Sequence, residues 1–168
     1  GVVMVRVGIN GFGRIGRMVL RAAWGMDDVK VVAVNDLGDP QSLAHLLQYD
    51  SVHGIWNQKV EWEKGGLRIG QTFIPLYGEK DPERIPWEEL GVELVIEATG
   101  RFTKKEKALS HCKGGAKRVL ITAPAEGADL TLVMGVNHES YDPQKHFVVS
   151  NASCTTNCLA PVVKVLHE

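Results

Sequence analysis

The apolar residues at the start of the chain follow two different periods. Val2–Ile9 is a short run rich in β-branched residues, which is typical of a buried strand. The segment Arg14–Trp24 repeats its apolar residues at helical spacing, and Lys30–Asn35 is again a short β-branched run. A strand, a helix and a second strand in this order predict a parallel βαβ unit.

A second set of strands follows after an irregular middle. Ser42–Leu47 suggests a short helix, and Lys59–Leu76 contains short runs broken by Gly65, Gly66 and Gly70, which favours antiparallel hairpins. Further buried strands are predicted over Val92–Ala98, Arg118–Thr122, Leu130–Met134 and Phe147–Val149.

The spacing of Thr103 and Glu106 predicts a capping box that opens a helix between two of these strands. The predicted fold is therefore α/β, a Rossmann-type doubly wound and mainly parallel sheet with an antiparallel insertion. We expect this domain to cover residues 1–150. Residues 151–168 are expected to begin a second domain, with a helix starting near Ser153 that is still running where the sequence stops.

Composition and charge narrow the class of protein. The 168 residues carry 19 basic and 20 acidic side chains, a formal net charge of −1, which gives no electrostatic reason to expect nucleic acid as a partner. No apolar run is long enough to suggest a membrane span, and no leader is expected, so a cytoplasmic protein is the simplest interpretation. The three cysteines are expected to be reduced thiols.

Three glycines after the first predicted strand match a dinucleotide-binding fingerprint. Gly11, Gly13 and Gly16 follow the spacing G-x-G-x-x-G between a strand and a helix. The first permits a tight turn, the second lets a pyrophosphate approach the backbone, and the third lets the helix pack on the strand. An ordinary turn between strand and helix is the alternative for each glycine taken singly.

Asp36 ends the second predicted strand and supports the same function. A carboxylate at this place can accept hydrogen bonds from the adenine ribose hydroxyls and would repel a 2′-phosphate. The next residues, Leu37, Gly38 and Asp39, offer no cation, so NAD is expected in preference to NADP. A solvated loop acid is the alternative.

Cys154 is a candidate nucleophile because it lies at the expected start of a helix, where a thiolate is favoured. Structural or redox-active cysteines also occur at such positions. Cys158 lies one turn further and fits a buried structural role, and His167 is about 20 Å along the same predicted helix, too far to relay a proton. No second ligand pair completes a zinc site, so no metal is expected.

The chain resembles the phosphorylating glyceraldehyde-3-phosphate dehydrogenases over its full length, through the motifs GINGFGRIGR, YDSVHG, EATGRF, MGVNH and SNASCTTNCLAP. The resemblance implies a pyrophosphate turn with Asn35 and Asp36 near the adenosine, and Thr99, Gly100 and Phe102 on the adenine side. It places Thr122 toward the nicotinamide. The residues implied for the turn are Asn10, Gly11, Phe12, Gly13, Arg14 and Ile15.

The resemblance also implies chemistry at Cys154. In that family the matching cysteine attacks glyceraldehyde 3-phosphate, hydride passes to NAD, and inorganic phosphate cleaves the resulting thioester. Ser153 and Thr155 match residues near the attacking phosphate. The family's catalytic histidine and substrate-phosphate clamp fall beyond Glu168, so this chain alone is expected to bind NAD but not to turn over.

Three other functions remain open at this point. The chain could be a stand-alone NAD-binding module, a thiol redox sensor using Cys154 and Cys158, or part of an erythrose-4-phosphate dehydrogenase, which the resemblance does not separate. The complete enzyme is expected to be a homotetramer.

Overall fold

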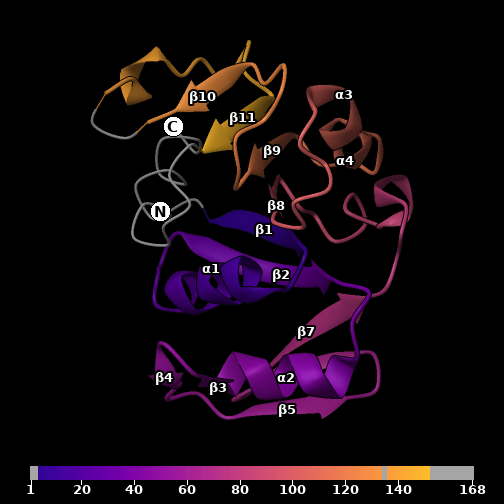
Figure 1. Ribbon diagram of the computed structural model, residues 1–168. Helices are drawn as coiled ribbons and strands as arrows, with labels where there is room; N and C mark the ends of the chain where they lie inside the picture. Colours follow the sequence, from indigo (N-terminus) through magenta and orange to yellow (C-terminus); the bar gives the residue numbers. More distant parts are fainter. Residues whose placement is uncertain (1–3, 134–135, 152–168) are drawn as a thin grey trace.

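The computed structural model describes residues 4–133 and 136–151. Its main sheet contains nine strands within these ranges, in the order β10-β11-β9-β8-β1-β2-β7-β6-β5. In Figure 1 this order runs from β10 at the top to β5 at the bottom. The strands of the sheet are β1 (Val5–Asn10), β2 (Val29–Asn35), β5 (Val60–Glu63), β6 (Gly66–Ile69), β7 (Thr72–Tyr77), β8 (Leu94–Glu97), β9 (Arg118–Ile121), β10 (Leu130–Leu132) and β11 (Val148–Asn151).

Short helices and a small hairpin complete the described chain. The two-stranded hairpin pairs β3 with β4. These remaining elements are α1 (Arg14–Trp24), α2 (Pro40–Gln48), β3 (Tyr49–Asp50), β4 (Gly54–Ile55), η1 (Pro82–Arg84), α3 (Lys105–Ala108), α4 (Ser110–Lys113) and η2 (His138–Ser140).

Parallel and antiparallel pairing are separated within the sheet. The strands from β10 across to β7 pair in parallel, whereas β5, β6 and β7 form an antiparallel meander at the edge. The chain moves from β1 outward to β2 and β7, then returns to place β8 on the other side of β1. This is a doubly wound α/β sheet with an antiparallel insertion, as the sequence predicts, and its switch point lies between β1 and β8.

Alternate residues of the central strands bury opposite faces of the sheet. Leu94 and Ile96 belong to the core that α1 covers, while Val95 between them packs with Trp87 on the other face. Helix α1 contributes its apolar stripe to the first face, through Val19, Leu20 and Ala23. Burial on both faces explains why the parallel strands are continuous apolar runs rather than alternating ones.

The capping box predicted at Thr103 and Glu106 is wrong. Helix α3 begins one residue later, with Lys104 as N-cap and no side-chain cap. The chain pairs there with a later loop: the Lys105 N–H donates to the Glu126 carbonyl, and the Glu126 N–H donates to the Thr103 carbonyl, at 3.0 and 2.8 Å. Because backbone from elsewhere in the chain satisfies the first helical N–H, a side-chain cap is not required.

Helix α1 has the predicted bounds, and most of the other predicted elements within the described residues are present with shifted ends. The strand predicted over Val92–Ala98 covers Leu94–Glu97, and the one predicted from Phe147 begins at Val148 and reaches Asn151. The helix predicted near Ser153 lies outside the described residues.

Asp129 holds three elements together at one end of the sheet. One carboxylate oxygen accepts the N–H groups of Phe147 and Val148 at 2.9 Å each, and the other accepts the Lys105 ammonium. Burial alone would raise the pKa of Asp129, but the hydrogen bonds from Lys105, Val148 and Phe147 outweigh it, and the pKa is lowered. The ionised form therefore stabilises the fold.

Replacing Asp129 with Asn should lower stability in a pH-dependent way. Since the folded-state pKa lies below the unfolded value of about 3.9, the stabilisation is present above that pH and is lost as the pH falls through the folded pKa. We expect Asp129→Asn to cost about 1–3 kcal/mol at pH 7, with the difference from the native chain shrinking below about pH 4. Urea unfolding across this range measures it. Asp27 is exposed, and Asp27→Asn should change stability by less than about 0.5 kcal/mol; a pH-independent loss at Asp129 would contradict the assignment.

Candidate functional site

Three polar residues end three neighbouring strands at the switch point. Asn10 of β1 lies opposite Asn35 of β2 on one side and Glu97 of β8 on the other. All three are buried, with relative exposures of 3%, 3% and 1%. In doubly wound sheets, ligands bind in the crevice outside the carboxyl ends of strands at such a switch point.

The glycine turn after β1 has the geometry that its three glycines predict. Gly11 has φ of +96°, which favours glycine, and a Cβ there would lie 2.7 Å from the Thr99 nitrogen. A Cβ on Gly16 would lie 2.0 Å from the Gly11 carbonyl oxygen, so helix and turn are in close backbone contact. Among the residues that the structure describes, a Cβ on Gly13 would meet nothing within 4 Å. Gly13 therefore leaves open space beside the turn.

The N-terminus of α1 faces this open space. Gly13 is the N-cap and supplies no side-chain cap, and the first turn contains no acidic residue. Gly13 and Arg14 are exposed, and Ile15 is half-buried. Backbone N–H groups without a capping side chain, at the positive end of a helix, form a binding place for a phosphate group. The residues present thus fit a dinucleotide pyrophosphate.

Phe12 contributes backbone to the turn rather than a side chain. Its side chain is fully buried in the core. Its N–H donates to Asp36 Oδ2 at 2.6 Å, and its carbonyl accepts from Arg17 Nη1 at 3.0 Å. Asp36 also accepts the N–H of Gly38, at 2.7 Å. The carboxylate predicted to meet a ribose therefore also connects the end of β2 to the glycine turn.

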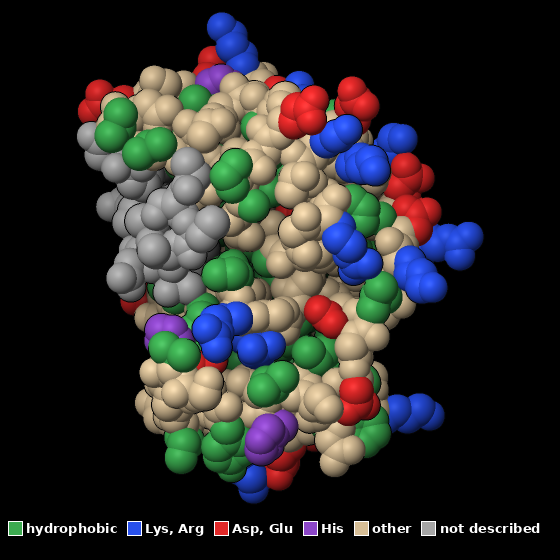
Figure 2. Space-filling model, viewed as in Figure 1, with side chains coloured by type: hydrophobic (Ala, Val, Ile, Leu, Met, Phe, Trp, Pro, Cys, Tyr) green, Lys and Arg blue, Asp and Glu red, His purple; other side chains and the backbone are tan. Residues whose placement is uncertain are grey.

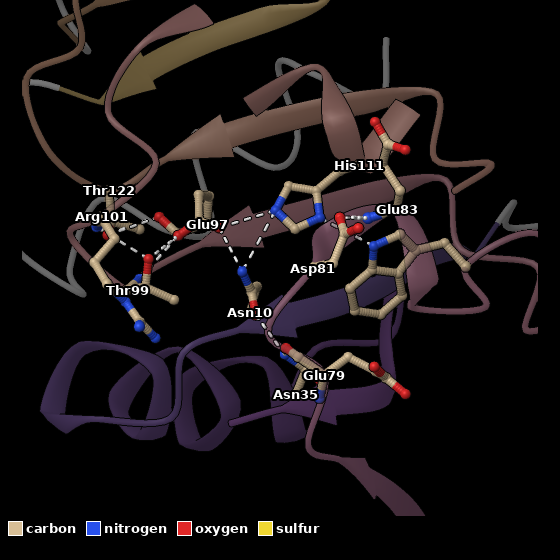
Figure 3. Close-up of polar contacts among 11 residues, drawn as sticks. Asn10, Asn35, Glu79, Asp81, Glu83, Glu97, Thr99, Arg101, His111 and Thr122 are labelled. Atoms are coloured by element: carbon tan, nitrogen blue, oxygen red, sulfur yellow. Dashed lines mark hydrogen bonds and ion pairs between the residues drawn. The ribbon is translucent and has the colours of Figure 1, made fainter. Parts of the chain in front are cut away.

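A buried polar network lies at the carboxyl ends of β1, β2 and β8 (Figure 3). Glu97 Oε1 accepts from Asn10 Nδ2 at 2.6 Å and from His111 Nε2 at 2.8 Å. Glu97 Oε2 accepts the N–H and the hydroxyl of Thr99, at 2.9 and 2.7 Å. Trp87 donates its indole N–H to His111 Nδ1 at 3.1 Å. Since an indole nitrogen only donates, Nδ1 accepts and the His111 proton is on Nε2.

The network continues through Asn10 to Asn35 at the end of β2. Asn35 Nδ2 donates to Asn10 Oδ1 and to the Glu79 carbonyl, each at 2.9 Å, and Asn35 Oδ1 accepts the Glu79 N–H. The segment after β7 is thereby held beside the end of β2. Figure 3 shows Asn10 between Glu97 and Asn35.

The structure gathers most of the residues singled out in the sequence. Thr99 and Gly100 follow β8, Thr122 follows β9 with its hydroxyl 3.3 Å from the Glu97 carbonyl, and the Phe102 ring lies 6.2 Å from the His111 ring. Ser153, Cys154 and Thr155 lie outside the described residues. Four residues of this network were not predicted from the sequence: Glu97, His111, Trp87 and Glu79. An acid that ends an otherwise apolar strand was the available signal for Glu97.

Cys112, on α4, is half-buried, and burial raises the pKa of its thiol.

Within residues 4–133 and 136–151, no three His, Cys, Asp or Glu side chains are grouped so that they could hold a metal ion. In the same ranges, no helix is long and apolar enough to cross a membrane. On the face shown in Figure 2, basic side chains near α3 and α4 are interspersed with acidic ones.

A doubly wound sheet with a glycine turn, an uncapped helix N-terminus and an acid after β2 defines a dinucleotide-binding domain of the Rossmann class. Comparison with known proteins gives the family. Residues 5–105 match the family described as glyceraldehyde 3-phosphate dehydrogenase, NAD binding domain. The chain belongs to this family, and NAD is its cofactor.

Bacterial relatives extend the similarity over nearly the whole chain. Glyceraldehyde-3-phosphate dehydrogenase of Geobacillus stearothermophilus is 58% identical over 164 residues, and glyceraldehyde-3-phosphate dehydrogenase 1 of Bacillus cereus is 56% identical over 165. Each comparison covers 98% of this chain and 49% of the relative. The chain thus spans about half the length of the curated relatives it matches.

Alanine at Gly13 and at Gly16 should separate binding from stability. Gly16→Ala forces a methyl group against the Gly11 carbonyl and should cost about 1–3 kcal/mol of stability. Gly13→Ala meets no atom of the described residues within 4 Å and should change stability by less than about 0.5 kcal/mol. It should nevertheless weaken NAD binding, because the methyl group enters the space beside the turn. Urea unfolding and calorimetric NAD titration measure the two effects. Native NAD affinity in Gly13→Ala would show that the pyrophosphate lies elsewhere.

Proposed function

We propose that this chain is the NAD-binding and nucleophile-bearing portion of a phosphorylating glyceraldehyde-3-phosphate dehydrogenase. The enzyme would convert glyceraldehyde 3-phosphate, NAD and inorganic phosphate to 1,3-bisphosphoglycerate and NADH. The observation that carries the proposal is the open glycine turn at the switch point, with Asp36 on one side and the Glu97 network on the other. Membership of the family and the names of the relatives support it.

The proposed nucleotide contacts follow the arrangement at the crevice. The pyrophosphate would meet backbone of the segment from Asn10 to Ile15, with Asn35 and Asp36 at the adenosine. Thr99, Gly100 and Phe102 would line the adenine side, and Thr122 would face the nicotinamide. Bound NAD would accept a hydride from the substrate carbon.

The proposed covalent step uses Cys154. Its thiolate would attack the aldehyde carbon to give the oxyanion of a thiohemiacetal, and loss of hydride from that carbon, as the oxyanion re-forms a carbonyl, would leave a thioester. Inorganic phosphate would then attack the thioester carbonyl, forming the acyl phosphate and releasing the thiolate. Ser153 and Thr155 would bind the attacking phosphate, and the Cys154 N–H would stabilise the oxyanion.

We further propose that the NAD-binding domain covers residues 1–150, that residues 151–168 begin the catalytic domain, and that the complete enzyme is a cytoplasmic homotetramer. Exposed apolar side chains on the hairpin side of the sheet support assembly, because large apolar groups at a surface often mark an interface. Four of them are Tyr49, Val52, Ile55 and Trp62, with relative exposures of 47%, 65%, 74% and 50%.

Removing the Asp36 carboxylate should weaken NAD binding and reduce the preference for NAD over NADP. We expect Asp36→Gly to raise the Kd for NAD by roughly tenfold to a hundredfold, since hydrogen bonds to a charged group contribute about 1.5–3 kcal/mol. Paired titrations with NAD and NADP measure the change.

Two further variants separate charge from support of the turn, because Asp36 also accepts the Phe12 N–H. Asp36→Asn keeps a hydrogen-bond acceptor but removes the charge, and it should still strengthen NADP binding relative to NAD binding. Asp39→Asn changes a neighbouring exposed acid that caps α2, and it should leave the ratio of the Kd values for NAD and NADP unchanged. If the ratio of the Kd values for NAD and NADP is unchanged in both Asp36 variants, Asp36 does not determine the selectivity between the two cofactors.

The nucleophile is tested in the protein that contains this chain. Cys154→Ser should abolish phosphate-dependent NADH formation from glyceraldehyde 3-phosphate, because a serine hydroxyl is a far weaker nucleophile than a thiolate at neutral pH. Cys112→Ala is the matched control and should retain turnover, since burial raises the pKa of that thiol and disfavours its thiolate.

A comparison of turnover rates with glyceraldehyde 3-phosphate and with erythrose 4-phosphate completes this test. Faster turnover of erythrose 4-phosphate would reassign the substrate, and turnover that persists in Cys154→Ser would rule out the thioester route. Limited iodoacetamide labelling should modify Cys154 before Cys112.

A further inference from the structure

Glu97 is a buried acid whose acceptor positions are all occupied from within the protein. Its two oxygens accept four hydrogen bonds, from Asn10 on β1, from His111 on α4 and, twice, from Thr99 just beyond β8. The side chain is only 1% exposed. A carboxylate placed in this way is shielded from a ligand in the crevice, and any effect on that ligand must pass through its partners.

Stability alone is a poor reason for an acid at this place. Taking a charge out of water is costly, and well-packed apolar residues of similar volume often give an equally stable or more stable fold. The hydrogen bonds of Glu97 do, however, orient groups at the carboxyl edge of the sheet. Thr99 uses its hydroxyl to donate to Glu97 and to accept the Arg101 N–H at 3.1 Å, so the turn that carries Gly100 is built on this carboxylate.

The same carboxylate determines how Asn10 is oriented. Because Asn10 Nδ2 must donate to Glu97, its Oδ1 is turned toward Asn35 and accepts from it at 2.9 Å. Asn35 in turn holds the backbone of Glu79. The direction of every hydrogen bond in this network, from the Trp87 indole to Glu79, is therefore consistent with an acceptor at both oxygens of residue 97 (Figure 3).

We propose that Glu97 is a positioning residue of the NAD site, which orients the turn at Thr99 and the Asn10 amide for the dinucleotide without contacting it. The inference rests on NAD binding by this chain. It assigns to the buried acid a share of nucleotide affinity, distinct from its contribution to folding.

Glutamine at residue 97 is a sharp probe because it keeps the shape and changes one acceptor into a donor. Its NH₂ group would face either the Asn10 and His111 donors or the two donors of Thr99. If the Asn10 amide reversed so that its oxygen accepted from the new NH₂ group, its own NH₂ group would face the NH₂ group of Asn35. If the His111 proton moved to Nδ1, it would face the indole N–H of Trp87. No rearrangement of these side chains satisfies every donor.

The experiment measures NAD affinity by calorimetry for the full chain and for Glu97→Gln, Thr99→Val and the double variant. We expect Glu97→Gln to raise the Kd for NAD at least about tenfold, because one misdirected buried hydrogen bond corresponds to a change of this order. The double variant should bind within about twofold of Glu97→Gln, since both changes interrupt one path.

Two controls separate positioning from folding. Glu63→Gln removes another acid, which is paired with Arg68 on the antiparallel meander, and it should leave the Kd for NAD unchanged. Val148→Ala opens the buried core of β11 and should lower the stability to urea while retaining NAD affinity. Equal loss of affinity in Val148→Ala and Glu97→Gln at matched stability would overturn the proposal in favour of a purely structural role.

The remaining outcomes are also decisive. Binding by Glu97→Gln within about twofold of native, or effects of the two changes that multiply in the double variant, overturns the proposal. If Glu97→Gln does not fold, Glu97→Asp decides, since a carboxylate shorter by one methylene group cannot keep the hydrogen bonds to both Asn10 and Thr99 and should weaken NAD binding severalfold, and native affinity would overturn the proposal. A native chain that does not bind NAD would instead refute the NAD-binding function itself.

Discussion

The parallel pairing of β1 with β8 is the constraint on which the rest of the molecule depends. It joins two halves of the sheet that are each wound outward from the centre, and it aligns Asn10 with Glu97 at the carboxyl edge. The glycine turn approaches the same junction, where Gly11 lies against the backbone of Thr99. Because both halves end here in polar groups rather than in apolar ones, the junction needs a complete set of hydrogen bonds, which the Glu97 carboxylate supplies.

This arrangement divides the two requirements of a nucleotide site between different residues. The parts that reach the surface at the carboxyl edge of the sheet are backbone and small side chains: Gly13 and Gly100 are exposed, and Thr99 is half-buried. The charged and aromatic side chains that fix them, Glu97 and Trp87, are buried beneath. A binding surface of backbone groups costs little side-chain entropy on binding, and packing of the groups beneath keeps it in position before a ligand arrives.

Local patterns were sufficient for most of the fold and for half of the site. The helical spacing of Arg14–Trp24 matches α1 residue for residue. Gly11 and Gly13 lie in the turn that their spacing predicts, and Gly16 lies in α1, packed against that turn. The residues that the sequence did not reveal are joined through space rather than along the chain. His111 and Glu97 are fourteen residues apart, and Trp87 and His111 are separated by twenty-four. The capping error at Thr103 has the same origin, because the loop at Glu126 replaces the local cap.

The position of β8 in the sequence has a consequence for how the protein folds during synthesis. Asn10 and Glu97 are bonded although eighty-seven positions separate them. As the ribosome extends the chain from its N-terminus, β1, β2 and the antiparallel meander are all made before β8. Until then, the edge of β1 that will become the centre of the sheet has unpaired backbone groups and an apolar surface, the combination that favours pairing with another chain. The nascent protein is therefore vulnerable to aggregation in the interval between synthesis of the meander and synthesis of the strand that begins at Leu94.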